Sequence, residues 1–164
     1  MAVHIHPLDI PSQYYTPIGQ IIVGWNLTEA LISSIIWKLH KIKDVRRGRA
    51  LIYGLPATQK LRVLAVSARH FTKSPGMDDE LKVFAQRAGT LNTQRNLLAH
   101  GLWGRMPKER LWKVFKMQEM DDRLLMIREE VTPTELDPVR IAQEIRILNS
   151  DFKKFMTRNR IPPP

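Results

Sequence analysis

Cysteine is absent from this chain of 164 residues, which excludes disulfides, thiolate metal sites and cysteine nucleophiles. The absence fits a reducing cytoplasm, and residues 1–15 lack the basic-then-apolar pattern of an export signal. Glycine-rich phosphate loops are also missing, because Gly101 and Gly104 lack the strand-to-helix context of a P-loop or dinucleotide site. No nucleophilic serine motif is present. We therefore expect a cytoplasmic protein whose function depends on other side chains.

Metal ligands are scarce as well. His4 and His6 alternate as two ligands on a strand would, but the full ligand set of a metal site does not accompany them. A flexible N-terminal arm over residues 1–15 is the better interpretation. Neither a metal nor a cofactor is expected.

Acidic residues are few compared with basic ones. The chain has 26 Lys and Arg against 16 Asp and Glu, which gives a formal net charge of +10. Such a balance favours an anionic partner, which could be nucleic acid, a nucleotide or an acidic protein. Charge alone does not choose among these three.

A long apolar run occurs once, over residues 18–37. Its length of about 20 residues would cross a bilayer. It holds Gln20, Asn26 and Glu29, however, and a central carboxylate costs roughly 2.5 to 3.5 kcal/mol on insertion scales. We interpret the run as a buried helix of a soluble bundle and expect no membrane partner.

Length and a hydrophobic content of 43% predict one globular domain over residues 1–164. The pattern predicts a mainly α fold, a bundle of about four to five helices with a small β-hairpin before the last helix. The N-terminal arm precedes a core over residues 16–158, and a loose proline-rich tail follows over residues 159–164. Helices are expected at 17–43, 58–70, 78–100 and 137–156, a basic loop at 41–49, and hairpin strands at 111–117 and 124–130.

Two charged residues interrupt the apolar stripes of the predicted helices. Glu29 lies on the stripe of the first helix and Arg95 on that of the third, whereas the last helix has no such interruption. The stripes are Ile18, Ile22, Trp25, Glu29, Ile32, Ile36 and Leu39; Leu81, Phe84, Ala88, Leu91, Arg95 and Leu98; and Ile141, Ile145, Leu148, Phe152 and Phe155.

A charge on an apolar face costs several kcal/mol unless it is paired or partly solvated. Glu29 and Arg95 could therefore be each other's partner. One interpretation is an ion pair between the first and third helices with no role in chemistry. The other places Arg95 at a cleft or subunit interface where an anionic ligand arrives, with Glu29 fixing its orientation.

His100 ends the third predicted helix, directly before Gly101. On an unbroken helix it would share a face with Asn96 and point well away from Arg95, which is five positions earlier. We expect the chain to leave the helix at His100, where the helix dipole favours the protonated imidazole of a general acid. A histidine that merely caps the helix is the plainer alternative.

The segment Arg95-Asn96-Leu97-Leu98-Ala99-His100 resembles the signature of the HEPN superfamily. That signature is an arginine, a polar residue and a histidine after four to six intervening positions, near the end of a helix in an all-helical bundle. The architectural resemblance covers residues 18–156, whereas the residue-level match covers only 95–103. The hairpin expected at 111–130 departs from a pure bundle.

The resemblance implies a metal-independent endoribonuclease whose active site forms where two subunits meet. Arg95 would bind the scissile phosphate, Asn96 would orient it or the histidine, and His100 would transfer a proton. The chemistry is consistent, because RNA supplies its own nucleophile in the ribose hydroxyl. A homodimer is implied, and so is a toxin or defence effector restrained by an antitoxin or regulatory protein.

Other candidates concern RNA contacts. The densest basic run contains Lys41, Lys43, Arg46, Arg47 and Arg49, and together with basic residues of the last helix it could bind an RNA backbone. A solvated loop is the alternative. The aromatic side chains of Trp103, Trp112 and Phe115 could stack on bases, although a place in the core is more usual beside a hairpin.

Three functions therefore stay open at the level of the sequence. The first is the ribonuclease, the second is a catalytically silent HEPN-like module that binds RNA, a nucleotide or a protein, and the third is a structural helical protein. Binding without turnover would support the second. The third function would be supported if the protein does not respond to RNA and if Arg95→Ala has no effect.

Overall fold

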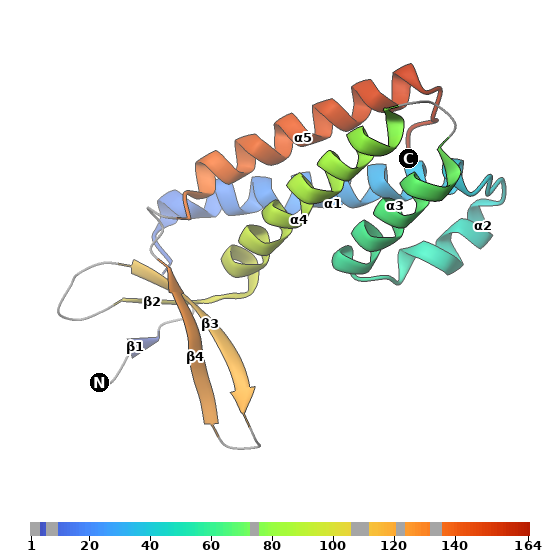
Figure 1. The fold of residues 1–164 in the computed structure, drawn as a ribbon. Helices are drawn as coiled ribbons and strands as arrows, with labels where there is room; N and C mark the ends of the chain where they lie inside the picture. Colours follow the sequence, from blue (N-terminus) through green and yellow to red (C-terminus); the bar gives the residue numbers. More distant parts are fainter. Residues whose placement is uncertain (1–3, 6–9, 73–75, 106–111, 121–123, 132–135) are drawn as a thin grey trace. The chain divides into compact units, whose positions relative to one another are not determined.

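The computed structural model describes residues 4–5, 10–72, 76–105, 112–120, 124–131 and 136–164. Over these residues the fold is mainly α, as predicted, with five α-helices and a small antiparallel sheet (Figure 1). The helices are α1 (Tyr15–Leu39), α2 (Val45–Gly48), α3 (Ala57–Phe71), α4 (Met77–His100) and α5 (Pro138–Arg158). The strands are β1 (His4–Ile5), β2 (Leu102–Arg105), β3 (Trp112–Met120) and β4 (Leu124–Val131), and the short turns are the 3-10 helix η1 (Ser12–Tyr14) and the π-helix η2 (Arg49–Tyr53).

Contacts divide the chain into two compact units, which we describe separately. The sheet unit contains Met1–Ile22 and Thr93–Gln143, and the bundle unit contains Val23–Asn92 and Glu144–Pro164. Helices α1, α4 and α5 contribute residues to both units. The expectation of one domain over residues 1–164 stays a prediction.

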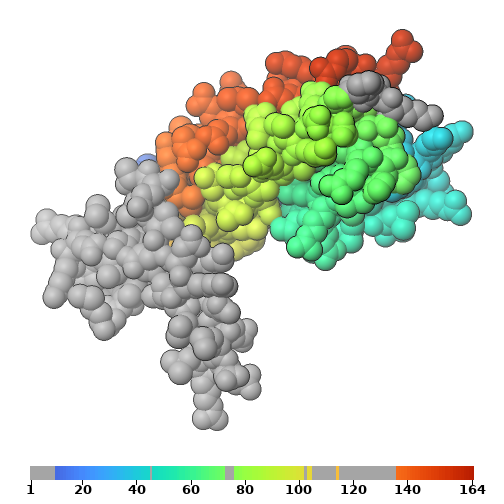
Figure 2. All heavy atoms as spheres, in the orientation of Figure 1, coloured from blue at the N-terminus to red at the C-terminus, as the bar shows by residue number. Residues whose placement is uncertain are grey.

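The core of the bundle unit follows the apolar stripes. The predicted stripe of α5 is buried throughout, and Phe84 of α4 packs its ring 4.8 Å from Phe152 and 5.7 Å from Phe155. Within this unit α4 and α5 lie side by side, as both the ribbon and the space-filling view show (Figures 1 and 2). On α1 the stripe is shifted by one residue at its start, because Ile21 is fully buried whereas Ile22 is exposed.

Helices α1 and α5 approach closely at Gly24. A Cβ added there would lie 2.9 Å from a methyl carbon of Ile145, so a larger residue would push the helices apart. Asn149 donates a hydrogen bond to the Gly24 carbonyl at 2.8 Å and accepts one from the Thr28 hydroxyl at 2.8 Å. These contacts satisfy the buried side chains of Thr28 and Asn149.

Two helices end in the same way, with a basic residue in the left-handed conformation. Lys41 follows α1 with φ 54°, and the amides of Lys41 and Ile42 donate to the carbonyls of Lys38 and Trp37 at 3.1 and 2.9 Å. This is a Schellman motif, a helix end usually closed by glycine. Arg160, with φ 50°, follows α5 in a matching arrangement. The first helix therefore ends at Leu39, earlier than the predicted residue 43.

The predicted basic loop at residues 41–49 and the predicted loose tail both require correction. Residues of the basic stretch form α2 and the start of η2, so the segment is partly helical. The tail is not helical, as expected, but the Ile161 side chain is buried and Pro162 to Pro164 line a cavity. Apolar burial of Ile161 holds the tail against the bundle unit.

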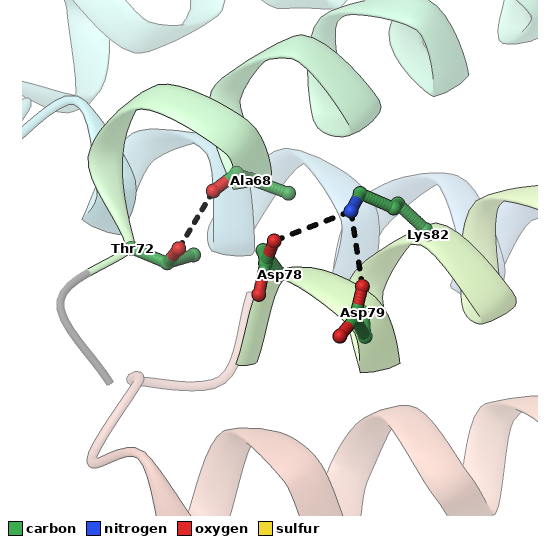
Figure 3. A network of polar contacts seen from close by, with 5 residues as sticks. All are labelled: Ala68, Thr72, Asp78, Asp79 and Lys82. Atoms are coloured by element: carbon green, nitrogen blue, oxygen red, sulfur yellow. Dashed lines mark hydrogen bonds and ion pairs between the residues drawn. The ribbon is translucent and has the colours of Figure 1, made fainter. Parts of the chain in front are cut away.

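The last turn of α3 and the first turn of α4 show how local sequence stabilises helix ends (Figure 3). The Thr72 hydroxyl donates to the Ala68 carbonyl at 2.7 Å at the end of α3. Lys82 donates to the carboxylates of Asp78 and Asp79 at 3.2 and 3.0 Å in the first turn of α4. The acidic residues thus lie at the positive end of the helix dipole, as predicted. Likewise, Asp137 caps α5 by accepting a hydrogen bond from the Val139 amide at 2.9 Å.

The sheet unit contains the predicted hairpin and two strands that were not predicted. Strands β3 and β4 pair antiparallel with Met120 opposite Leu124, so three residues connect them. The sheet order is β1-β2-β3-β4. His4 pairs with Arg105 of β2, so this part of the predicted flexible arm is a strand. His6 lies outside the described residues.

One helix is long and apolar enough to span a membrane, judged by its length and composition alone. It is the segment Ser12–Leu39, which includes α1, within the part of the chain that the structure describes. The same helix carries Trp25, Ile32, Ile35 and Ile36 with 0 to 1% of their surfaces exposed. This packing is compatible with the core helix of a soluble protein.

Candidate functional site

The structure brings the three predicted catalytic residues together at the end of α4. One guanidinium nitrogen of Arg95, Nη1, donates to Asn96 Oδ1 at 2.7 Å and lies 3.2 Å from His100 Nε2. Asn96 and His100 are exposed, and Arg95 is partly exposed. A ligand in solvent can therefore reach this cluster.

The contact between Arg95 and His100 corrects one expectation. Helix α4 continues through His100, and the Gly101 amide still donates to the Leu97 carbonyl at 2.9 Å. The expected separation of the two side chains does not occur, although the helix is intact. The Arg95 side chain is long enough to reach His100 along the intact helix. The imidazole therefore does not have to move out of the helix to make the contact.

The donor and acceptor roles in this contact follow from the guanidinium. It has five N–H donors and no acceptor, so Nε2 of His100 accepts the hydrogen bond. In the tautomer that makes this bond, the ring proton lies on Nδ1. Such a histidine can take up a proton at Nε2, which is the state needed at the start of base catalysis.

The chain that follows the site is anchored in the core of the sheet unit. Trp103 is 3% exposed and donates from its indole nitrogen to the Leu98 carbonyl at 3.2 Å. The Tyr14 ring lies 5.4 Å from the Trp103 ring. Trp103 is therefore a core residue, the more usual of its two predicted roles. The side chains of Trp112 and Phe115 lie outside what the structure describes.

Part of the Arg95 side chain has no partner among the described residues. Its Nε is buried without a hydrogen bond, and so is Oε1 of the neighbouring Gln94. Among the described residues, the side-chain hydrogen bonds of the guanidinium both use Nη1. An unsatisfied donor on a charged group is costly, and such groups concentrate at functional sites.

Glu29 has a partner other than Arg95 within the bundle unit. Its carboxylate accepts hydrogen bonds from Lys60 Nζ at 2.6 Å and from Trp25 Nε1 at 2.9 Å, all within the bundle unit. Lys60 is the partner that the sequence analysis missed. It lies on the buried face of α3 with Leu61, Leu64, Ser67 and Ala68, so a charge on an apolar stripe was again the available signal.

The predicted RNA-contacting residues are all exposed in the bundle unit, as a nucleic-acid surface requires: Lys41, Lys43, Arg46, Arg47 and Arg49. Among the basic residues of α5, Lys153 and Lys154 are also exposed. Arg158 is paired with Glu80 and is less available to a phosphate.

The bundle unit also contains a large cavity that the sequence analysis did not predict. Its volume is about 1020 Å³. It is lined from α1, the segment after α1, η2, α3 and the tail by Asn26, Glu29, Ala30, Ser33, Ser34, Trp37, Lys38, Ile42, Lys43, Arg49, Tyr53, Lys60 and Pro162 to Pro164. No sequence motif marks these residues as a group.

Within the described ranges, no three His, Asp or Glu side chains lie close enough together to hold a metal ion. Comparisons of the chain with protein-family models, with curated proteins and with solved structures gave no match.

Proposed function

We propose that this protein is a metal-independent endoribonuclease of the HEPN type. The observation that supports the proposal is the contact of 3.2 Å between Arg95 Nη1 and His100 Nε2 at a solvent-accessible helix end. It places a permanent cation and a titratable base within reach of one phosphodiester. A cytoplasmic location and a homodimer belong to the same proposal.

The reaction follows from these two groups and from the substrate. A phosphate oxygen binds the solvent-accessible part of the Arg95 guanidinium. His100 Nε2, released from Arg95, takes the proton of the ribose 2′-hydroxyl. The 2′-oxygen then bonds to phosphorus, and the bond to the 5′-oxygen breaks, which yields a 2′,3′-cyclic phosphate and a 5′-hydroxyl. The leaving oxygen takes a proton from a second acid.

A second copy of the chain could supply that acid. A dimer would place two Arg95 and two His100 side chains around one groove, so that one histidine accepts a proton while the other donates one. Asn96 acts as a positioning residue, because its amide oxygen already fixes Nη1 of Arg95. A toxin or defence role would require an antitoxin or regulatory protein as a further partner.

The test is cleavage of an end-labelled RNA pool in excess chelator by wild type, Arg95→Ala, Arg95→Lys and His100→Ala. We expect cleavage to fall at least 100-fold in all three variants, since lysine keeps the charge but not the planar set of donors. Matched controls come from the last turn of α3, where Arg69 and His70 are exposed. Arg69→Ala and His70→Ala should cleave at the wild-type rate.

The outcome also separates the alternative function. RNA that is shifted on a gel but not cut by wild type would favour a silent RNA-binding module at Arg95. RNA that is neither cut nor shifted on a gel, by wild type or by Arg95→Ala, would favour a structural role.

A further inference from the structure

The cavity of the bundle unit is built from residues other than the Arg95 cluster. At about 1020 Å³ it is as large as the upper range of small-molecule sites. The charged side chains of its lining are four cations, Lys38, Lys43, Arg49 and Lys60, against one carboxylate, Glu29. An excess of cations of this kind attracts an anion.

One part of the lining is already neutralised. Lys60 is 6% exposed, and its ammonium donates to Glu29 at 2.6 Å. The carboxylate is further fixed by the indole N–H of Trp25 at 2.9 Å. Because both charges are satisfied here, this pair gives a polar, neutral wall and leaves the other three cations to bind the ligand.

The other three cations are available. Lys38, Lys43 and Arg49 are exposed and have no ion-pair partner among the described residues. Elsewhere in the bundle unit, carboxylates pair with Lys82, Arg87 and Arg158. Unpaired cations around a cavity are a suitable setting for one or more phosphate groups.

Two aromatic side chains also line the cavity. Trp37 is held in place by Gly48, where an added Cβ would lie 2.6 Å from the indole ring. Tyr53 is 79% exposed, so its ring is open to solvent. A fixed indole and an exposed phenol provide ring surfaces on which a planar ligand can stack.

Polar groups complete the lining. Asn26, Ser33 and Ser34 of α1 supply amide and hydroxyl groups that can hydrogen-bond a sugar or a base edge. Together the lining offers cations for phosphate, rings for stacking and neutral donors and acceptors between them. We propose that this cavity binds a small phosphorylated molecule with one planar ring, of the nucleoside phosphate class.

Isothermal titration with three probes tests the proposal on the full-length protein. ATP carries both ring and phosphates, adenosine carries only the ring, and inorganic triphosphate carries only the charge. We expect ATP to bind at least about tenfold more tightly than either fragment, because stacking and charge contribute together. GTP, CTP and UTP should also be titrated, since stacking tolerates different bases.

Variants assign the binding to the cavity. Lys43→Gln with Arg49→Gln should weaken ATP and triphosphate by about tenfold or more, whereas Tyr53→Ala should weaken ATP and leave triphosphate unchanged. Arg62→Gln, at an exposed arginine of α3 outside the cavity, and Arg95→Ala should bind ATP as wild type does. Circular dichroism shows that each variant is folded.

Three results would overturn the proposal. The first is the absence of heat for all four nucleotides at millimolar concentration with folded wild-type protein. The second is triphosphate binding as tight as ATP binding, which would identify a simple anion site. The third is loss of ATP binding in Arg95→Ala alone, which would place the nucleotide at the other cluster.

Discussion

Arg95 donates a hydrogen bond to a histidine five residues later on the same unbroken helix, with 3.2 Å between Nη1 and His100 Nε2. Because the guanidinium cannot accept, His100 Nε2 is the acceptor in this contact. A phosphate that binds the Arg95 guanidinium would replace His100 Nε2 as its hydrogen-bond acceptor. Nε2 would then be available for proton transfer. The resting contact therefore links phosphate binding to the availability of the base.

Replacing Lys60 by methionine should destabilise the protein by about 2–3 kcal/mol, because it leaves the Glu29 carboxylate without its main partner in a partly buried place. Lys60 is nearly buried, whereas 26% of the Glu29 side chain is exposed. Urea unfolding measures the change. Lys82→Met, which removes an exposed pair, is the control and should have a much smaller effect. Equal losses in the two variants would contradict a special role for the Lys60 pair.

Gly48→Ala should cost about 1–3 kcal/mol of unfolding free energy, since the new methyl would meet the Trp37 ring at 2.6 Å. Gly19→Ala in α1 is the matched control, because nothing lies within 4 Å of the added carbon. It should stabilise the protein by about 0.5–1 kcal/mol through the higher helix propensity of alanine. Thermal or urea denaturation would show opposite signs for the two substitutions. The same sign for both would refute the close contact at Gly48.

Glycine at the two Schellman positions should stabilise the protein. Lys41 and Arg160 occupy the left-handed region at φ 54° and 50°, which costs a residue with a side chain more than it costs glycine. Lys41→Gly and Arg160→Gly should each raise the unfolding free energy by about 0.5–1 kcal/mol. Lys38→Gly, at the penultimate residue of α1, should lower the unfolding free energy. A loss of stability in both Schellman variants would argue against this helix ending.

The ion pairs at the start of α4 should make stability depend on pH in a defined direction. The hydrogen bond from Lys82 lowers the pKa of Asp78, and hydrogen bonds to Asp79 and Asp78 raise the pKa of Lys82. The stabilisation is therefore present at neutral pH. It is lost as pH falls through the lowered pKa of Asp78, and again as pH rises through the raised pKa of Lys82.

The difference in Tm between wild type and Lys82→Gln measures this dependence across pH. It should be largest near neutrality, shrink towards both extremes and be smaller in high salt, because the pair is exposed. A difference that is constant from acid to alkaline pH would show that Lys82 acts by helix propensity or packing instead.

The helices were predictable because their apolar periodicity and end signals agree. The α5 stripe is buried as predicted, and both the Asp137 cap and the stop at Gly101 are where the sequence places them. The hairpin was predictable from alternation. Strands β1 and β2 were not, because two and four residues carry too little pattern, and they depend on the pairing of β2 with β3 and of β1 with β2.

The site was only partly predictable for a different reason. Sequence identified Arg95 and His100 but placed their side chains apart, since helix periodicity describes Cβ directions and not the reach of a long guanidinium. It also did not identify Lys60 as a partner of Glu29. Lys60 and Arg95 both interrupt apolar stripes, and only the packing of α3 against α1 shows which one meets the carboxylate.

The most direct measurement is the end group left on RNA after digestion in excess EDTA, determined by mass spectrometry for wild type, Arg95→Ala and His100→Ala. We predict 2′,3′-cyclic phosphate ends with wild type and intact RNA with both variants, because the ribose hydroxyl is the nucleophile and both side chains are required. Intact RNA with folded wild type, or products with a 3′-hydroxyl and a 5′-phosphate, would contradict the proposed chemistry.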